Sequence, residues 1–168
     1  MTALPKVEDL IDSMTADLKR QLAERGARAP VMIGIHSGGV WVAERLHRNL
    51  AIVEPLGTLD ISFYRDDFSR AGLQPQVRPS HLPFEVEGRT IILVDDVLYT
   101  GRTIRAALNV IFDYGRPASV LLAVLVDRGE RELPVAADVT GARLQLPPGE
   151  HIKLTGPEPL TLVARSVA

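Results

Sequence analysis

The sequence predicts an α/β protein in which a central, mostly parallel β-sheet is flanked by helices. Short apolar runs alternate with longer segments in which apolar residues recur every three or four positions. This alternation favours parallel strands, because each crossover helix then covers one face of the sheet. With 168 residues, of which 46% are hydrophobic and 24% charged, the chain can bury one ordinary core. We therefore expect a single domain over residues 1–168.

The first half of the chain is predicted to contain two helices and two strands. In the opening helix, apolar residues from Val7 to Leu22 step by three or four, and the helix ends near Gly26. Val31–Ile35 is an uninterrupted apolar run, typical of a buried strand. Val40–Leu50 returns to helical spacing, and Leu59–Tyr64 is predicted to be the second strand.

Residues 65–88 differ in composition from the segments on either side. Prolines and turn-forming residues cluster there with charged ones, beginning at Arg65-Asp66-Asp67. A connection of this length inside a compact domain is usually functional, so we predict a flap or hairpin over the site, with a disordered linker as the alternative.

The second half continues the alternation of strands and helices. Thr90–Val94 is strongly β-prone, and Ile104–Tyr114 has helical spacing up to the stop signal Gly115-Arg116-Pro117. Ser119–Val126 is predicted to be another buried strand. From Val135 onward, short β-like pieces alternate with proline–glycine turns.

Composition excludes several classes of protein. No apolar run approaches the roughly 20 residues of a membrane-spanning helix, and no signal peptide is visible, so we expect a cytoplasmic protein. The absence of cysteine excludes disulfides and thiolate metal sites. With 19 Lys and Arg residues against 21 Asp and Glu residues, the net charge is −2. Binding of nucleic acid would therefore need a local basic patch.

The strand at Thr90–Val94 leads into the segment with the clearest chemistry. Two carboxylates, Asp95 and Asp96, precede a small polar turn that opens a helix. Gly101 permits a tight turn, Thr100 and Thr103 offer hydroxyls, and the N–H groups at a helix N-terminus favour an anion. This arrangement suits a phosphate monoester in the turn and sugar hydroxyls, a metal ion or a developing positive charge at the carboxylates.

Other interpretations of this segment are weaker. One Asp could be an ordinary helix N-cap and the other a surface residue. A P-loop is disfavoured because Gly-x-x-x-x-Gly-Lys is absent, and a dinucleotide-binding fold is disfavoured because Gly-x-Gly-x-x-Gly is absent.

The segment Ile91–Thr103 resembles the PRPP-binding signature of the type I phosphoribosyltransferases. The version found in the PyrR family, bifunctional pyrimidine operon regulators and uracil phosphoribosyltransferases, is the most similar. Leu59–Asp67 resembles that family's strand entering the flap, and Leu122–Gly129 with Arg131–Pro134 resembles the strand and loop beside the base. Ile33–Ile35 with Gly39 resembles the pyrophosphate-loop region, so the resemblance spans roughly residues 31–141.

This resemblance implies the type I phosphoribosyltransferase fold and the reaction of uracil with PRPP to give UMP and pyrophosphate. Mg²⁺ would be carried mainly by the substrate, without dedicated protein ligands, and the protein would form a homo-oligomer, a dimer or tetramer. The catalytic residues implied are Asp95, Asp96 and, on the flap, Arg65. The 5′-phosphate and ribose would be bound by Asp95, Asp96, Val97, Leu98, Tyr99, Thr100, Gly101, Arg102 and Thr103, pyrophosphate by Ser37, Gly38 and Gly39, and the base by Val126, Asp127 and Arg128.

The sequence departs from the family pattern at two places. The pyrophosphate loop typically reads Thr-Arg-Gly, and here Gly38 replaces the Arg, which predicts weaker catalysis. In the segment associated with binding of an mRNA leader, Glu130 replaces a His, Ala136 an Arg and Ala142 a Lys, while Arg131 remains. Two alternative functions stay open: an RNA-binding attenuator with vestigial catalysis, and a phosphoribosyltransferase for another base.

Overall fold

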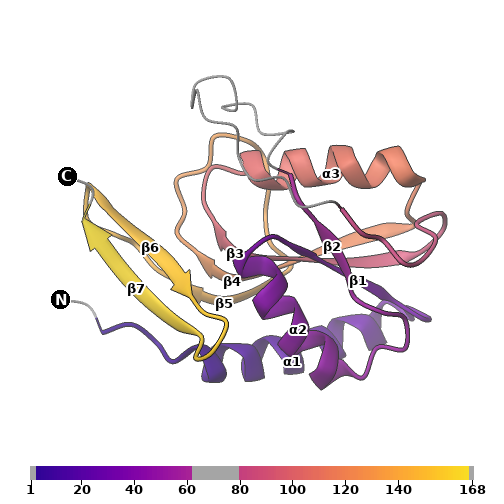
Figure 1. Cartoon of the computed structure of the whole chain (residues 1–168), viewed down its shortest axis with the longest axis horizontal. Helices are drawn as coiled ribbons and strands as arrows, with labels where there is room; N and C mark the ends of the chain where they lie inside the picture. Colours follow the sequence, from indigo (N-terminus) through magenta and orange to yellow (C-terminus); the bar gives the residue numbers. More distant parts are fainter. Residues whose placement is uncertain (1–2, 62–79, 167–168) are drawn as a thin grey trace.

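A computed structural model of the chain describes residues 3–61 and 80–166 and has a five-stranded sheet at its centre (Figure 1). All neighbouring strands of this sheet are parallel, in the order β2-β1-β3-β4-β5. The strands are β1 (Val31–Ile35), β2 (Gly57–Leu59), β3 (Thr90–Leu98), β4 (Ser119–Asp127) and β5 (Val139–Arg143). The predicted fold class is thus confirmed.

Three helices cover the two faces of the sheet. Helices α1 (Val7–Glu24) and α2 (Gly38–Leu50) lie on one face, and α3 (Arg102–Tyr114) lies on the other (Figure 1). Side chains alternate along the strands, so Met32 packs in the core beneath α1 and α2, whereas Val31 and Ile33 pack in the core beneath α3. Both faces of the central strands are buried, which explains the continuous apolar runs in β1 and β4.

The second strand lies earlier in the sequence than the predicted Leu59–Tyr64, because β2 spans Gly57–Leu59 and shares only Leu59 with the prediction. Its parallel pairing with β1 ends at Ile35↔Leu59, where β1 itself ends. Residues 62–64 and most of the predicted flap, including Arg65, lie outside the described residues. The described end of the predicted flap contacts the sheet, because His81 forms an antiparallel bridge with Thr58 and Val86 is buried.

The third strand is longer than predicted, because it continues to Leu98. Asp95 and Asp96 therefore lie within β3 and not after it. Pairing with β4 continues to Leu98↔Asp127, which holds the acidic residues in extended backbone. Local β-propensity could not reveal this, because Asp is depleted in strands in general.

The C-terminal region divides between two sheets. β5 extends the main sheet, while β6 (Glu150–Thr155) and β7 (Thr161–Ser166) form a separate antiparallel hairpin. Ile152, Leu154 and Leu162 bury this hairpin in the same core as α1 and α2. Within residues 3–61 and 80–166, no helix is both long and apolar enough to cross a bilayer.

Candidate active site

The loops that follow β1, β3 and β4 meet at one edge of the sheet, because these strands are adjacent and parallel. In open α/β sheets, ligands bind at this carboxyl edge. The predicted pyrophosphate-binding residues lie at Ser37 and at the start of α2, and the predicted phosphate- and ribose-binding residues run from the end of β3 through the turn into α3. The predicted base-binding residues are the last two residues of β4 and the residue after it. The fold therefore brings the three predicted subsites together.

The turn from β3 into α3 has the geometry of an anion site. Gly101 takes a φ of +96°, a left-handed conformation that glycine adopts without steric cost. The Thr100 hydroxyl accepts a hydrogen bond from the backbone N–H of Arg102 at 3.2 Å, and Arg105 N–H donates to the Gly101 carbonyl at 3.0 Å. The N–H groups in the first turn of this 13-residue helix have no carbonyl partner inside the helix, and the helix dipole favours negative charge there.

Each of the two acidic side chains is oriented by a hydrogen bond from the backbone N–H of the next residue. Asp95 is 5% exposed and its Oδ1 accepts the N–H of Asp96 at 2.8 Å, while Asp96 Oδ1 accepts the N–H of Val97 at 2.8 Å. These bonds orient both carboxylates at the end of β3. Because Asp96 is only half-buried, its second oxygen can reach a ligand in the site.

Two glycines allow the N-terminus of α2 to approach these carboxylates. A Cβ on Gly38 would lie 2.1 Å from Oδ2 of Asp96. A Cβ on Gly39 would lie 2.7 Å from the carbonyl oxygen of Val94 and 3.3 Å from Oδ1 of Asp95. The predicted pyrophosphate loop and acidic pair are therefore in direct contact. The carboxylate of Asp96 also occupies the space that a side chain at position 38 would need.

The surroundings of Asp127 lower the pKa of its carboxyl group. Burial raises the pKa of Asp127, but hydrogen bonds from the Arg131 guanidinium at 2.7 Å and the Gly129 N–H at 2.9 Å lower it, and the net shift is downward. Asp127 is therefore an anion at neutral pH. Its ion pair with Arg131 is largely shielded from water, with side chains 15% and 22% exposed.

The Arg128 side chain joins the loop after β4 to the turn after β3 and to the β6–β7 hairpin. Its guanidinium lies 3.9 Å from the centre of the Tyr99 ring and contacts Nδ1 of His151 at 3.2 Å and Oε2 of Glu130 at 3.4 Å. The contact with His151, on the β6–β7 hairpin, was not predicted from the sequence. Only the fold places residue 151 beside residue 128.

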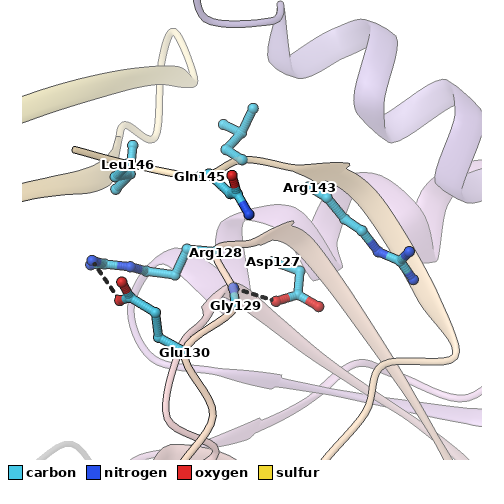
Figure 2. Close-up of a pocket in the computed structure, with 8 residues that line it drawn as sticks. Asp127, Arg128, Gly129, Glu130, Arg143, Gln145 and Leu146 are labelled. Atoms are coloured by element: carbon cyan, nitrogen blue, oxygen red, sulfur yellow. Dashed lines mark hydrogen bonds and ion pairs between the residues drawn. The ribbon is translucent and has the colours of Figure 1, made fainter. Parts of the chain in front are cut away.

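An open pocket of about 690 Å³ lies beside Asp127 (Figure 2). Figure 2 shows Asp127 between Gly129 and Arg143, with Arg128 and Glu130 directed toward each other. The lining residues come from the ends of β4 and β5 and the loops after them: Asp127, Arg128, Gly129, Glu130, Arg143, Leu144, Gln145 and Leu146. Of the predicted base-binding residues, Val126 has a fully buried side chain, so only its backbone could contact a ligand.

In the part of the chain that the structure describes, no three His, Asp or Glu side chains converge on a point where a metal ion could bind. Hard carboxylate oxygens are nevertheless present at Asp95 and Asp96, beside the glycine-lined loop. This arrangement fits a cation that keeps several water and phosphate ligands, as Mg²⁺ does.

Comparison with known proteins identifies similar sequences and folds. The family model described as "Phosphoribosyl transferase domain" matches residues 1–153. The chain is 59% identical over 160 residues to the "Bifunctional protein PyrR" of Pseudomonas aeruginosa strain PAO1, which covers 95% of this chain and 94% of that protein. It is 60% identical over 156 residues to the protein of the same name from Nitrosococcus oceani, covering 92% and 88%.

Solved structures show the same fold at lower identity. A hypoxanthine phosphoribosyltransferase of Trypanosoma cruzi aligns with a TM-score of 0.67 and 22% identity, covering 86% of this chain and 78% of that one. A hypoxanthine phosphoribosyltransferase of Staphylococcus aureus aligns with a TM-score of 0.64 and 19% identity, covering 85% and 77%.

Proposed function

The chain belongs to the phosphoribosyl transferase domain family and to the PyrR proteins within it, and from this premise we propose that it transfers the 5-phosphoribosyl group of PRPP to uracil. In this reaction the bond between C1 of ribose and pyrophosphate breaks, a bond from C1 to N1 of uracil forms, and the N1 proton is released. The products are UMP and pyrophosphate. The observation that carries the proposal is the direct contact between the glycine loop after β1 and the acidic pair of β3, beside the phosphate turn.

Each subsite has a physical role in this proposal. The turn Thr100–Thr103 binds the 5′-phosphate through N–H groups at the start of α3 and through hydroxyls. Asp95 and Asp96 hold the ribose hydroxyls and stabilise the positive charge that develops at C1 in an oxocarbenium-like transition state. Asp127 and Arg128, with the backbone of Val126, lie beside the base. Arg65 on the flap would help to exclude water.

Mg²⁺ bound with PRPP would neutralise pyrophosphate as a leaving group. Of the chain's own side chains, Asp95 and Asp96 are the ones that would hold it, because their oxygens lie beside the pyrophosphate loop.

The missing arginine at position 38 lowers the expected rate. Without it, the backbone N–H groups of Ser37–Gly39, at the start of α2, bind pyrophosphate. A lost charged hydrogen bond is worth about 1.5–3 kcal/mol, which is on the order of 10- to 150-fold in kcat/KM. A kcat/KM for PRPP equal to that of a relative with arginine would contradict this expectation.

A panel of bases tests the proposed substrate. The purified protein, incubated with Mg²⁺-PRPP and uracil, cytosine, hypoxanthine or guanine, should form UMP and pyrophosphate with uracil. The same protein without PRPP is the blank. Formation of IMP or GMP without UMP would show that the substrate is a purine base and not uracil. Formation of no nucleotide would favour the alternative of vestigial catalysis.

Binding of an mRNA leader is the second candidate function, and the word "bifunctional" in the relatives' names supports it. Two features of the chain weigh against a large basic surface. Glu130 is exposed, and the Arg131 guanidinium is held by internal partners. Filter binding of leader RNA at several salt concentrations tests this function. A steep fall of affinity with salt would support it, and a flat response would contradict it.

We also propose that the chain acts in the cytoplasm as one domain and as a homo-oligomer, a dimer or tetramer. The absence of a spanning helix among the described residues is compatible with this location.

A further inference from the structure

We infer that Arg131 is a positioning residue that holds the phosphate-binding turn in its binding conformation and links that turn to the base-binding loop. The inference rests on the proposed function, since it assigns the turn to the 5′-phosphate. Arg131 lies on the loop after β4, and its role depends on contacts with the turn after β3.

The carbonyl groups of the phosphate turn are bound from the side of the β4–β5 loop. The Leu98 carbonyl accepts the N–H of Arg128 at 3.0 Å, and the Thr100 carbonyl accepts the N–H groups of Glu132 at 2.9 Å and Leu133 at 3.0 Å. Between them, the Tyr99 carbonyl accepts NH1 of Arg131 at 2.8 Å. Because a peptide's N–H and C=O point in opposite directions, fixing these carbonyls orients the neighbouring N–H groups toward the sheet edge.

Arg131 is the only side chain among these donors, and it binds four acceptors. Besides the Tyr99 carbonyl, it donates to the carbonyls of Val135 at 2.8 Å and Gly129 at 3.3 Å, and to Oδ2 of Asp127 at 2.7 Å. A planar guanidinium with five N–H donors can satisfy all four at once. A lysine has three donors on one nitrogen and cannot span the same acceptors, although it keeps the charge beside Asp127.

The contact with Asp127 joins two subsites. Asp127 pairs in register with Leu98, so the acid lies one strand away from the start of the phosphate turn. Arg131 thus contacts a carboxylate beside the base and a carbonyl beside the phosphate. Packing reinforces the link, because a Cβ on Gly101 would lie 3.1 Å from Cγ2 of Val135.

The gain in affinity that the 5′-phosphate gives to a ligand depends on whether the turn keeps its phosphate-binding conformation. We compare the dissociation constants of UMP and of uridine, which differ only in that phosphate, for the wild type, R131K and R131M. The matched control is R89M. Arg89 also binds a backbone carbonyl, that of Ala29 at 2.8 Å, and a carboxylate, that of Glu54 at 3.7 Å, but at the start of β3, the opposite edge of the sheet.

The inference predicts a selective loss. In R131M the ratio of the dissociation constant of uridine to that of UMP should fall on the order of 10- to 100-fold because the turn is no longer held, with a smaller fall in R131K and none in R89M. KM for PRPP should rise most in R131M, less in R131K and not at all in R89M. A general loss of structure would weaken UMP and uridine alike and leave the ratio unchanged.

Two other results separate the inference from the function on which it rests. If the wild type prefers UMP strongly and both Arg131 variants keep that preference, Arg131 does not position the turn. If the wild type itself binds UMP no better than uridine, the turn is not a phosphate site, and the proposed function fails together with the inference. If R131M does not fold, R131K decides, because it retains a cation beside Asp127.

Discussion

Asp127 shows how a single side chain combines stability with a place in the site. It accepts hydrogen bonds from the Gly129 N–H and the Arg131 guanidinium, and these bonds outweigh the effect of burial on its pKa. A carboxylate whose pKa is lower in the folded state stabilises the fold while it is ionised. The same bonds fix the conformation of the loop after β4, from which Arg131 also donates a hydrogen bond to the Tyr99 carbonyl.

The lowered pKa of Asp127 predicts a pH-dependent stability. The contribution of Asp127 should be complete above its unfolded pKa of about 3.9 and disappear as the pH falls through the lower folded value. D127N should therefore be less stable than the wild type by about 1–3 kcal/mol at pH 7, and the difference should shrink below about pH 4. Urea denaturation at pH 7, 5 and 3.5 measures this. A difference that stays constant over these pH values would contradict the assignment.

The acidic pair of β3 can be tested without disturbing the backbone. In the double variant D95N/D96N, the amide oxygens can still accept the N–H groups of Asp96 and Val97, so the fold should persist. Turnover should be abolished, since losing even one electrostatic stabiliser of a transition state typically costs on the order of 100- to 1,000-fold. Circular dichroism and a UMP-formation assay report fold and turnover separately. Retained activity would refute the roles given to both residues.

Ala51 has a left-handed backbone conformation, which glycine adopts more readily than alanine. It ends α2 with a φ of +52°, and the N–H groups of Ala51 and Ile52 donate to the carbonyls of Arg48 and His47. This is the helix-ending motif in which glycine is preferred. A51G should raise the free energy of unfolding by about 0.5–1 kcal/mol. The control A16G, at an exposed position inside α1, should lower it by about 1 kcal/mol. Thermal denaturation measures both, and a lower stability of A51G would contradict the prediction.

At the scale of elements, the site depends on how closely α2 approaches the sheet. Three glycines on β1 and α2 make this approach possible. A Cβ on Gly34 would lie 2.9 Å from Cβ of Ala43, and Gly38 and Gly39 contact Asp96 and the β3 backbone in the same way. The N-terminus of α2 is thereby brought against the acidic pair.

Gly39→Ala should therefore damage the site. Its methyl group would lie 2.7 Å from the Val94 carbonyl, so α2 must move away from β3. We expect a loss of about 1–3 kcal/mol in stability and a clear fall in kcat/KM for PRPP. Gly88→Ala is a useful control, because Gly88 has a φ of +71° but nothing near its Cβ position. It should lose about 1–2 kcal/mol of stability with kcat/KM unchanged. Unchanged kcat/KM in Gly39→Ala would show that the close approach is not required.

At the scale of the whole molecule, the β6–β7 hairpin shares a core with α1, α2 and the main sheet. Leu154 is 2% exposed and Leu162 is 5% exposed in that common core. The hairpin also supplies His151 to the neighbourhood of Arg128. Its packing therefore affects both the stability of the domain and the shape of the region proposed for the base.

This shared core supports the proposal of a single domain and makes it testable. Thermal unfolding should show one cooperative transition, and Leu154→Ala should lower the stability of the whole molecule by about 2–5 kcal/mol. The exposed substitution Phe112→Ala, on α3, should change the stability far less. Two separate transitions, with Leu154→Ala affecting only one, would show that the hairpin region unfolds independently.

Much of this architecture could be predicted from the sequence. The first helix, predicted to end near Gly26 and observed as Val7–Glu24, the strand Val31–Ile35 and the alternation of strands and helices follow from apolar spacing, because period and burial are linked in both elements. The segment Asp95–Thr103 also predicts a phosphate and sugar site, since carboxylates followed by a Thr-Gly-Arg-Thr turn place acceptors and N–H donors side by side. These features are local, so neighbouring residues determine them.

Only the tertiary structure decided the rest. The extension of β3 through Asp95 and Asp96 depends on pairing with β4. The contact of Gly38 with Asp96 depends on packing between α2 and β3, since the two residues are 58 positions apart in sequence. The four acceptors of Arg131 likewise come from turns and strand ends that meet only after folding. The spacing of residues along the chain determines on which face of a helix or strand a side chain lies. The packing between helices and strands determines which other residues that side chain contacts.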